Sequence, residues 1–464
     1  MVEKLPITQY RNRLGPKEIE CDSTRNLTPL TEIIGQERAT KALHFGLNID
    51  EKGFNIFVSG LHGTGRKSAV TKFIDELAKT KPKGSDWVYV NDFQNPYEPD
   101  AIRLPSGMGK ELKGDMETFI TEAKRFIPKV FESEDYINRR DETIKEIEEE
   151  KSKLFSHISE VAQEKGFMIQ PGPSGLLTIP VKDDKPLEQE EFLSLPKEEQ
   201  DAFQKRKEEL MSELRSTFRK LRELDQKGTE AIEELNREVA LNATGHRVAA
   251  LGDKYEEYPE ILAYIEAVRK DIVENLPHFM PQQQQQEQEK MPPQFQFQNM
   301  LLRELSFRKY EVNVIVDNDG VEGAPVVFEQ NPTYQNLFGK IEKEVQYGVV
   351  TTDFTMIRPG AIHKANGGFL VFLAEDLFRN PYTWDGLKNA LKSGEVIIEE
   401  PGERLGFITT KGIRPSPIPL DVKVVIIGTP MINHILYTQD PDFSELFKVK
   451  AEFDTTMDRD EENI

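Results

Sequence analysis

The sequence predicts an α/β fold with a parallel sheet, interrupted by a long antiparallel coiled-coil insertion that carries a small β-hairpin tip. Three observations predict it. An apolar strand at residues 56–58 passes through a glycine-rich turn into a helical pattern, a charged helical stretch fills residues 116–300, and strand-like runs return after residue 310. The residues DWVYVNDF, at 86–93, predict a second strand after the first helix. Two strands separated by a helix indicate parallel pairing, and the helical stretch that follows indicates an insertion.

The turn after the first strand predicts a phosphate-binding P-loop. It reads SGLHGTGRKSAV, and its backbone N–H groups would meet an anion at the positive end of the next helix. The full pattern, G-x-x-x-x-G-K-[ST], ends in a lysine for the outer phosphates and a hydroxyl for Mg²⁺. Here Arg66 and Lys67 take those places, and Ser68 comes one residue late. The expected nucleotide contacts are Gly60, Gly63, Thr64, Gly65, Arg66, Lys67 and Ser68; the alternative is a glycine turn that only joins strand to helix.

Composition narrows the class of protein. The chain has 464 residues, a net charge of −21 and one cysteine, Cys21. The acidic balance disfavours nucleic acid and anionic membranes as partners, and a single cysteine excludes a disulfide framework. No apolar run approaches the roughly 20 residues of a membrane span, and the N-terminal residues show no signal-peptide core. These features predict a soluble, cytoplasmic protein.

The insertion reads as a helical hairpin. Two runs of apolar residues at threes, fours and sevens predict its coiled-coil seam: Ile137, Ile144, Ile147, Leu154, Ile158 and Val161 in the first arm, and Leu210, Leu214, Leu221, Leu224, Ile232, Leu235 and Val239 in the second. Between them, GFMIQPGPSGLLTIPV predicts a β-hairpin tip. The arms either reach for a partner or act as a passive spacer, and the sequence leaves both open.

The second α/β half contains a strand in NGGFLVF, of the kind that ends in acidic residues in P-loop ATPases. One such carboxylate holds Mg²⁺ and another polarises water. Leu373 and Ala374 occupy the two expected positions, and Glu375 and Asp376 follow two residues later. These acids are therefore candidate catalytic carboxylates that lie out of register. The last predicted strand ends at Thr429, where a polar sensor of the γ-phosphate is expected.

Five longer motifs together resemble the AAA+-like region of Lon-related proteases of the LonB and LonC type. They are IIGQERATKALHFGL, SGLHGTGRKSAV, NPTYQNLFGKIE, TDFTMIRPGAIHKANGGFL and FKVKAEFDTTMDRD. The resemblance implies an AAA+-like domain, a homo-oligomeric ring such as a hexamer, unfolded or misfolded polypeptide substrates, and ATP or ADP as ligand. In that family a helical lid and a serine protease domain with a Ser–Lys dyad follow. This chain ends at Ile464, where the lid would begin, so we expect it to lack the protease domain.

The expected organisation follows from these motifs. It comprises an N-terminal extension at 1–33, the first half of the AAA+-like domain at 34–115, the insertion at 116–305 with a low-complexity linker at 282–298, the second half at 306–450, and the start of a lid at 451–464. Within the second half, residues 346–358 are a candidate pore loop, in which Tyr347 and Phe354 either grip unfolded chain or pack in the core.

Several residues invite a catalytic interpretation that their surroundings do not support. Ser174 lies in a Gly-Pro-Ser-Gly turn upstream of Lys220, but turn chemistry explains the motif without catalysis. His62 and His363 lack partners at metal or triad spacing. A basic residue that reaches a neighbour's phosphates could only be Lys448 or Lys450, because the segment FSELFKVK contains no arginine.

We therefore predict a substrate-handling and gating module of a Lon-related protease. Its eroded loop and shifted acids predict weak nucleotide binding, with Mg²⁺ not required. The first alternative is an active ATP-driven unfoldase of the same protease. The second is a non-proteolytic AAA+ regulator or scaffold, and the lack of a readable DNA-binding helix pair argues against a transcriptional activator.

Overall fold

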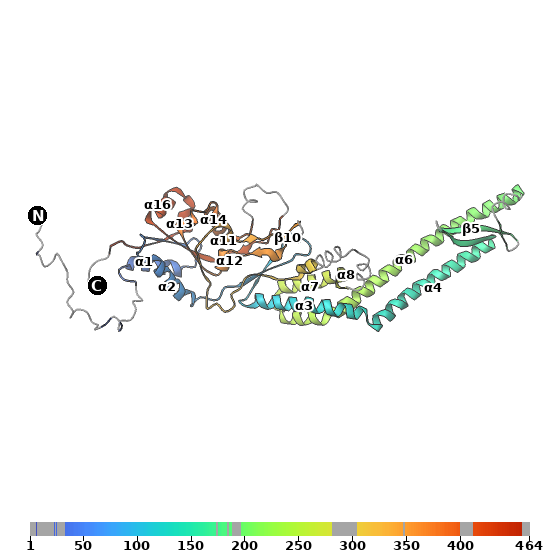
Figure 1. Cartoon of the computed structure of the whole chain (residues 1–464), viewed down its shortest axis with the longest axis horizontal. Coiled ribbons are helices and arrows are strands. Elements are labelled where there is room, and N and C mark those ends of the chain that lie inside the picture. Colours follow the sequence, from blue (N-terminus) through green and yellow to red (C-terminus); the bar gives the residue numbers. More distant parts are fainter. Residues whose placement is uncertain are drawn as a thin grey trace.

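The structure is a computed structural model that describes residues 33–172, 175–182, 185–187, 196–280, 304–346, 349–399 and 412–456, together with Pro6, Ser23 and Arg25. The molecule is elongated. An α/β body lies at one end and a two-helix arm extends to the other, as Figure 1 shows.

The body is built on a five-stranded parallel sheet. Its strand order is β17 (Val449–Glu452), β1 (Ile56–Ser59), β16 (Val422–Gly428), β13 (Gly368–Leu373) and β8 (Val326–Glu329). Every neighbouring pair is parallel. All four residues of β1 are buried, which is typical of a central strand covered on both faces. The predicted parallel α/β fold is confirmed.

Helices cover both faces of this sheet. Ile56 and Val58 point to a core that includes Leu43 and Val70, whereas Phe57 points to the opposite core, because successive side chains of a strand alternate between faces. The helices are α1 (Glu37–Asn48) and α2 (Arg66–Ala78) on the first face, and α11 (Tyr334–Phe338), α12 (Ala361–Lys364), α13 (Ala374–Leu377), α14 (Thr383–Ser393), α16 (Pro430–Gln439) and α17 (Pro441–Leu446) in the second half of the chain.

A second sheet corrects one prediction. The strand expected at residues 86–93 forms as β2 (Asp86–Val90), but it pairs antiparallel with β3 (Asp100–Leu104) and β7 (Asn313–Val316) rather than joining the parallel sheet. The Asp86 carboxylate accepts hydrogen bonds from the backbone N–H groups of Gly107, Gly109 and Asn318, at 2.8, 3.0 and 2.8 Å. This carboxylate ties the sheet to the first helix of the insertion.

The chain leaves the parallel sheet after α2 and returns to it before β8 at one place. The backbone N–H of Ala324 donates to the carbonyl of Ala78, at 2.9 Å, so α2 ends beside the segment that leads into β8. Between these points lie α3 (Met108–Phe131), α4 (Glu134–Glu164), β4 (Phe167–Gly172), β5 (Gly175–Lys182), β6 (Lys185–Pro186), α6 (Lys197–Lys254), α7 (Pro259–Glu274), α8 (Leu276–Phe279) and the 3₁₀ helix η3 (Arg308–Tyr310). Helix α3 begins at Met108, before the expected start of the insertion at 116.

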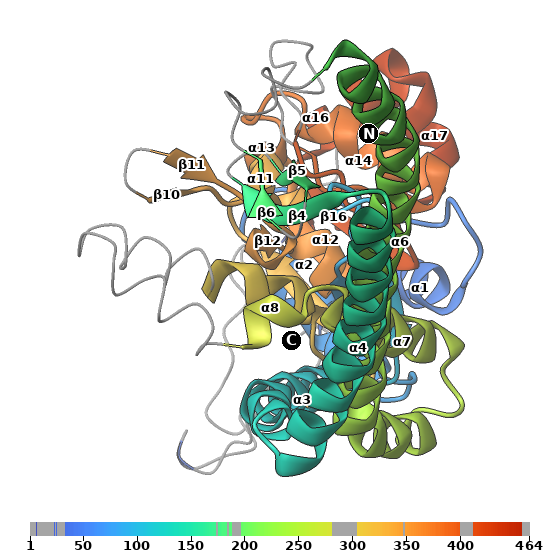
Figure 2. The same cartoon turned by 90° about the vertical axis from the view of Figure 1, so that its right-hand side faces the viewer.

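The arm is the predicted antiparallel helical hairpin with a β tip. Helices α4 and α6 run side by side, and β4 pairs with β5 from Phe167 to Gly172 (Figures 1 and 2). Two predicted seam residues are wrong: Ile137 and Ile144 are 37% and 41% exposed. The buried residues of α4 are Tyr136, Ile158 and Ala162, so Ile158 is the predicted seam residue of this helix that is fully buried.

Short paired strands complete the second half of the body. They are β9 (Lys340–Ile341) with β12 (Ile357–Arg358), β10 (Glu344–Gln346) with β11 (Val349–Thr351), and β14 (Glu395–Val396) with β15 (Ile418–Pro419), and the 3₁₀ helix η4 (Phe354–Met356) follows β11. Among the described residues, no helix is both long enough and apolar enough to cross a membrane.

Candidate functional site

The predicted loop lies at the carboxyl edge of the parallel sheet. It connects the end of β1 to Arg66, the first residue of α2, and the N–H of Ala69 donates to the carbonyl of Gly65 at 2.9 Å. Gly63 and Gly65 have φ values of 86° and 84°, a left-handed conformation that glycine adopts without strain. The loop therefore presents backbone N–H groups at a helix N-terminus, which suits a phosphate group.

Arg66 does not project into solvent. Its side chain is 8% exposed, and its guanidinium donates to the carbonyl of Gly428, at the end of β16. A Cβ added to Gly60 would lie 2.9 Å from Cδ of Arg66, so the arginine stem covers that glycine. Burial lowers the pKa of Arg66, and the charge of Glu375 partly opposes this. Arg66 therefore lies along the edge of the sheet, where the negative charge of Glu375 favours its charged form.

The two candidate catalytic acids, Glu375 and Asp376, have different environments near the loop. Strand β13 ends at Leu373, and Glu375 and Asp376 lie in the first turn of α13. Oε1 of Glu375 is buried and has no hydrogen-bond partner within the described part of the chain. Asp376 pairs with Arg379 at 3.1 Å, and with Lys67 it lines a cavity of about 230 Å³ at the end of β13. Glu375 thus acts on Arg66 through its charge, whereas Asp376 shares a cavity lining with Lys67.

A groove of about 470 Å³ runs from the loop to the start of α1. Gly63, Thr64, Gly65 and Ser68 form one side, and Ile33, Ile34, Gln36 and residues 454–456 form the other. The Gln36 side chain exchanges two hydrogen bonds with the backbone of Asp454, at 3.1 and 2.9 Å. Sequence reasoning missed Ile33, Ile34 and Gln36 as site residues. These residues could have been identified from the sequence IIGQ, because it directly precedes a helix that packs beside the loop.

These residues fit a nucleotide better than they fit Mg²⁺. Loop N–H groups and the exposed Lys67 suit a diphosphate, and the apolar Ile33 and Ile34 suit a flat base. The position expected for a metal-binding hydroxyl holds an ammonium group. Across the described ranges, no group of three His, Cys, Asp or Glu residues could hold a metal ion. The chemistry this arrangement supports is anion binding at a helix N-terminus.

Other predicted residues have different environments. The hydroxyl of Thr429 caps α16 by accepting the N–H of Ile432 at 3.4 Å. Lys450 pairs with Glu452 at 3.2 Å, and the Lys448 ammonium lies 4.9 Å from the centre of the Phe54 ring. Both lysines are therefore engaged within their own chain.

Of the two predicted pore-loop residues, the structure describes Phe354 but not Tyr347. Phe354 is 3% exposed and packs in the core of the body, so the interpretation that it grips substrate is wrong in this structure. Its helix η4 is held because Asn313 donates to the carbonyls of Phe354 and Ile357, at 2.8 and 3.0 Å. Tyr347 lies outside the described residues, as does Ser174.

His363 is a buried core residue. Its Nδ1 accepts the N–H of Gly360 at 3.3 Å, and its Nε2 has no hydrogen-bond partner among the residues the structure describes. Burial lowers the pKa of His363 to about 3. The imidazole is therefore neutral in the folded protein near neutral pH.

This burial predicts a pH dependence of stability. Below pH ~6.5 the unfolded chain takes up a proton that folded His363 does not bind until about pH 3. The free energy of unfolding should therefore fall as the pH is lowered through this window, by at most ~1.4 kcal/mol per pH unit. His363→Gln should lose about 1–2 kcal/mol less than the wild type between pH 6.5 and 5 in urea titrations. Equal losses in both proteins would contradict the assignment, and exposed His62→Gln is the control.

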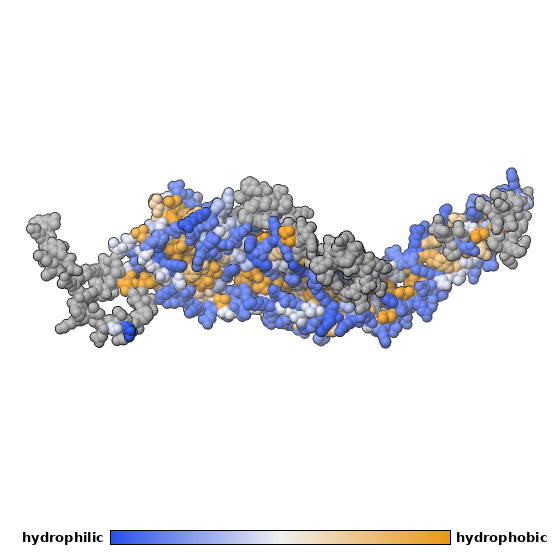
Figure 3. Space-filling view, in the orientation of Figure 1, coloured by the Kyte–Doolittle hydropathy of each residue, from blue (hydrophilic) through white to orange (hydrophobic). Residues whose placement is uncertain are grey.

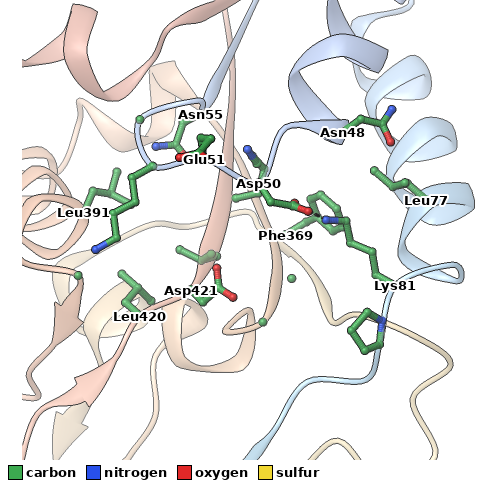
Figure 4. A pocket seen from close by; sticks show the side chains of 18 of the residues that line it. Asn48, Asp50, Glu51, Asn55, Leu77, Lys81, Phe369, Leu391, Leu420 and Asp421 are labelled. Carbon is green, nitrogen blue, oxygen red and sulfur yellow. Dashed lines mark hydrogen bonds and ion pairs between the residues drawn. The ribbon is translucent and has the colours of Figure 1, made fainter.

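A larger cavity, of about 580 Å³, lies at the opposite edge of the sheet, where β1, β13 and β16 begin (Figure 4). Lys81 pairs with Asp50 at 2.5 Å. Lys423 donates to the carbonyls of Ile49 and Phe54, and burial lowers its pKa. Lys81 pairs with a carboxylate and Lys423 satisfies two backbone carbonyls, so we assign both lysines a structural role.

The fold and loop define the class of protein. A parallel sheet with the order β17-β1-β16-β13-β8 and a glycine-rich loop after the central β1 is an AAA-type P-loop domain. Residues 322–454 match the family model described as "LonB-like, AAA domain", and residues 86–119 match the model described as "Lon-like LonC helical domain". These two stretches of the chain are thus similar to Lon-related proteins.

A Lon protease homolog of Escherichia coli (strain K12) is 28% identical over 125 residues, which cover 25% of this chain and 20% of that protein. The match thus spans about one fifth of the length of this relative. The crystal structure of NtrX from Brucella abortus aligns with a TM-score of 0.20 and 15% identity, over 28% of this chain and 27% of that one.

Proposed function

We propose that this chain is the substrate-handling and gating module of a Lon-related serine protease, and that its nucleotide site does not hydrolyse ATP. One observation carries the second part of the proposal. Arg66 is buried with its guanidinium on the carbonyl of Gly428, and Lys67 stands where a metal-binding hydroxyl is expected. Asp376 pairs with Arg379, so the two acids of α13 do not form a free pair of carboxylates that could bind a metal.

Hydrolysis requires more than binding. A metal and a correctly placed carboxylate stabilise charge that develops only in the transition state, and this is worth several kcal/mol. Backbone N–H groups can hold a diphosphate without a metal. ATP or ADP would thus bind weakly and serve as a structural or regulatory ligand of the module.

The β10–β11 hairpin is the part of the body that we assign to gating. Val345, on β10, is 67% exposed. Arg308, at the end of the insertion, contacts Glu344 at 3.4 Å and Asp353 at 3.3 Å, on the two sides of the hairpin. A movement of the insertion would therefore be passed to the hairpin through this arginine. In a ring of copies, such hairpins could contact an unfolded or misfolded polypeptide near the axis.

The proposal is tested by measuring nucleotide binding and ATP turnover by the purified chain, with and without Mg²⁺. We expect weak binding that does not depend on Mg²⁺, with turnover at the background of the buffer. Steady Mg²⁺-dependent hydrolysis that Glu375→Gln or Asp376→Asn abolishes would instead establish an ATP-driven unfoldase. The buried, unpartnered Oε1 of Glu375 is the observation that keeps this second function under test.

A further inference from the structure

We propose that the arm carries an interface for the arm of a second copy of this chain, paired antiparallel and face to face. The interface is one face of the α4–α6 hairpin, which we call the arm face. The proposal is independent of the nucleotide site. It rests on exposed apolar side chains, a groove between the helices, and the distribution of charge along the same face.

The exposed apolar residues of the two helices share this face. On α4, Ile137, Ile144 and Lys151 are spaced by seven, which places them on one side of the helix. On α6, Met211, Phe218 and Asp225 have the same spacing.

Lys151 and Asp225 form an ion pair between the helices. Because each belongs to one of the two stripes, the ion pair shows that both stripes open on the same side of the hairpin. Phe155, four residues beyond Lys151, extends the α4 stripe. The exposed fractions are 37% for Ile137, 41% for Ile144, 41% for Phe155, 39% for Met211 and 37% for Phe218.

The arm face is also hollowed. Gly228 lies opposite Ile147, and a Cβ added to it would still be 3.5 Å from that side chain. The resulting groove of about 400 Å³ is lined by Ile144, Ile147 and Ile232, with Glu148 and Glu233 at its rim. A groove of this kind accepts a large apolar side chain from a facing helix, as in knobs-into-holes packing. Figure 3 shows apolar residues on the arm between hydrophilic ones.

Charge along the arm face selects the partner. Towards the tip, the apolar residues are flanked by the exposed bases Lys207, Arg215 and Arg222. Towards the body they are flanked by the exposed acids Glu134, Glu148 and Glu233. No ion pair within the described chain involves any of these six residues. Two copies in antiparallel orientation would place each basic half against an acidic half.

Such a contact is isologous, because each copy contributes the same surface. Two helical hairpins that bury one shared apolar face form a four-helix bundle, a common solution for helices with a remaining exposed stripe. Phe155 and Phe218 of one copy would face the Ile144 groove of the other. The second copy is therefore the occupant that both the shape and the charge of this face fit.

The test is the mass of the full chain by sedimentation equilibrium at low and high salt. We expect Arg215→Glu with Arg222→Glu to halve the mass of the wild-type assembly, with arm–arm dissociation raised on the order of 100-fold. Glu148→Lys with Glu233→Lys should do the same. Combining all four changes restores opposite signs across the interface and should restore the mass. Salt should weaken the wild-type contact.

The matched control reverses the same number of charges on the other side of the arm, by Lys153→Glu with Lys220→Glu. It should leave the mass unchanged, and helical content should be equal in all variants. Ring assembly through the α/β body multiplies every mass by the same factor, so the ratio of two remains diagnostic. Equal masses for the wild type and the Arg215/Arg222 variant, or no recovery in the fourfold variant, would overturn the proposal.

Discussion

Replacing both Arg66 and Lys67 by alanine should abolish nucleotide binding by this chain. Arg66 holds the loop from beneath through Gly60 and Gly428, and Lys67 is the exposed cation beside the backbone N–H groups of the loop. Hydrogen bonds to charged groups contribute about 1.5–3 kcal/mol each, so the loss of both should weaken binding on the order of 100-fold or more. Binding is measured by titration calorimetry with ADP, in the presence of Mg²⁺ and of a chelator.

A control must distinguish the loss of phosphate contacts from a structural change of the site caused by the substitutions. Arg66→Ala leaves Glu375 with a buried charge, so the double variant is compared with one that also contains Glu375→Gln. Lys79→Ala, beyond the far end of α2, should bind ADP as the wild type does. If the Arg66/Lys67 variant retains wild-type affinity, the backbone of the loop alone holds the phosphates and our assignment of these cations is wrong.

Gly323→Ala should destabilise the body by several kcal/mol. Gly323 has a φ of 77°, and an added Cβ would lie 2.0 Å from the carbonyl oxygen of Ala78. Left-handed strain costs about 1–2 kcal/mol, and a clash with a backbone that cannot move away costs roughly 1–3 more. The clash falls where the insertion rejoins the body, so the hydrogen bond from Ala324 to Ala78 should break as well.

Gly320→Ala isolates the steric contribution. Gly320 has a φ of 74°, yet nothing lies within 4 Å of an added Cβ. This variant should show the strain without the clash, and its unfolding midpoint should lie between those of the wild type and Gly323→Ala. Urea unfolding followed by the fluorescence of Trp87 and Trp384 measures both. Equal midpoints for the two variants would show that the chain relaxes around Gly323.

The sequence predicted the architecture because its signals were local and long. The strand, glycine turn and helix at 56–74, and the long polar helices, needed no tertiary information. The place of β2 was not predictable in the same way. A short strand that is buried on both faces has the same sequence pattern in a parallel and in an antiparallel sheet. Here the hydrogen bonds that Asp86 accepts hold the strand in the second sheet.

The candidate site was predicted by residue but not by orientation. Gly60 to Ser68 and the shifted acids were identified from spacing, and they lie at one edge of the sheet. That Arg66 turns onto Gly428 depends on residues hundreds of positions away, which no local pattern reveals. The burial of Phe354 could not be predicted either. The sequence pattern of an aromatic residue in a loop is the same whether its side chain points to solvent or into the core.

The order of the strands has a consequence for synthesis of the chain. Ile56 pairs with Val425 and Val449, both encoded far downstream. At roughly 5–20 residues per second, ribosomes would take on the order of 20–80 seconds to supply these partners. During this time the apolar strand β1 has emerged without neighbours, while the helical insertion, whose contacts are closer in sequence, can already fold. A nascent chain of this protein would thus present a folded arm before it has a completed sheet, and holding chaperones would meet β1 first.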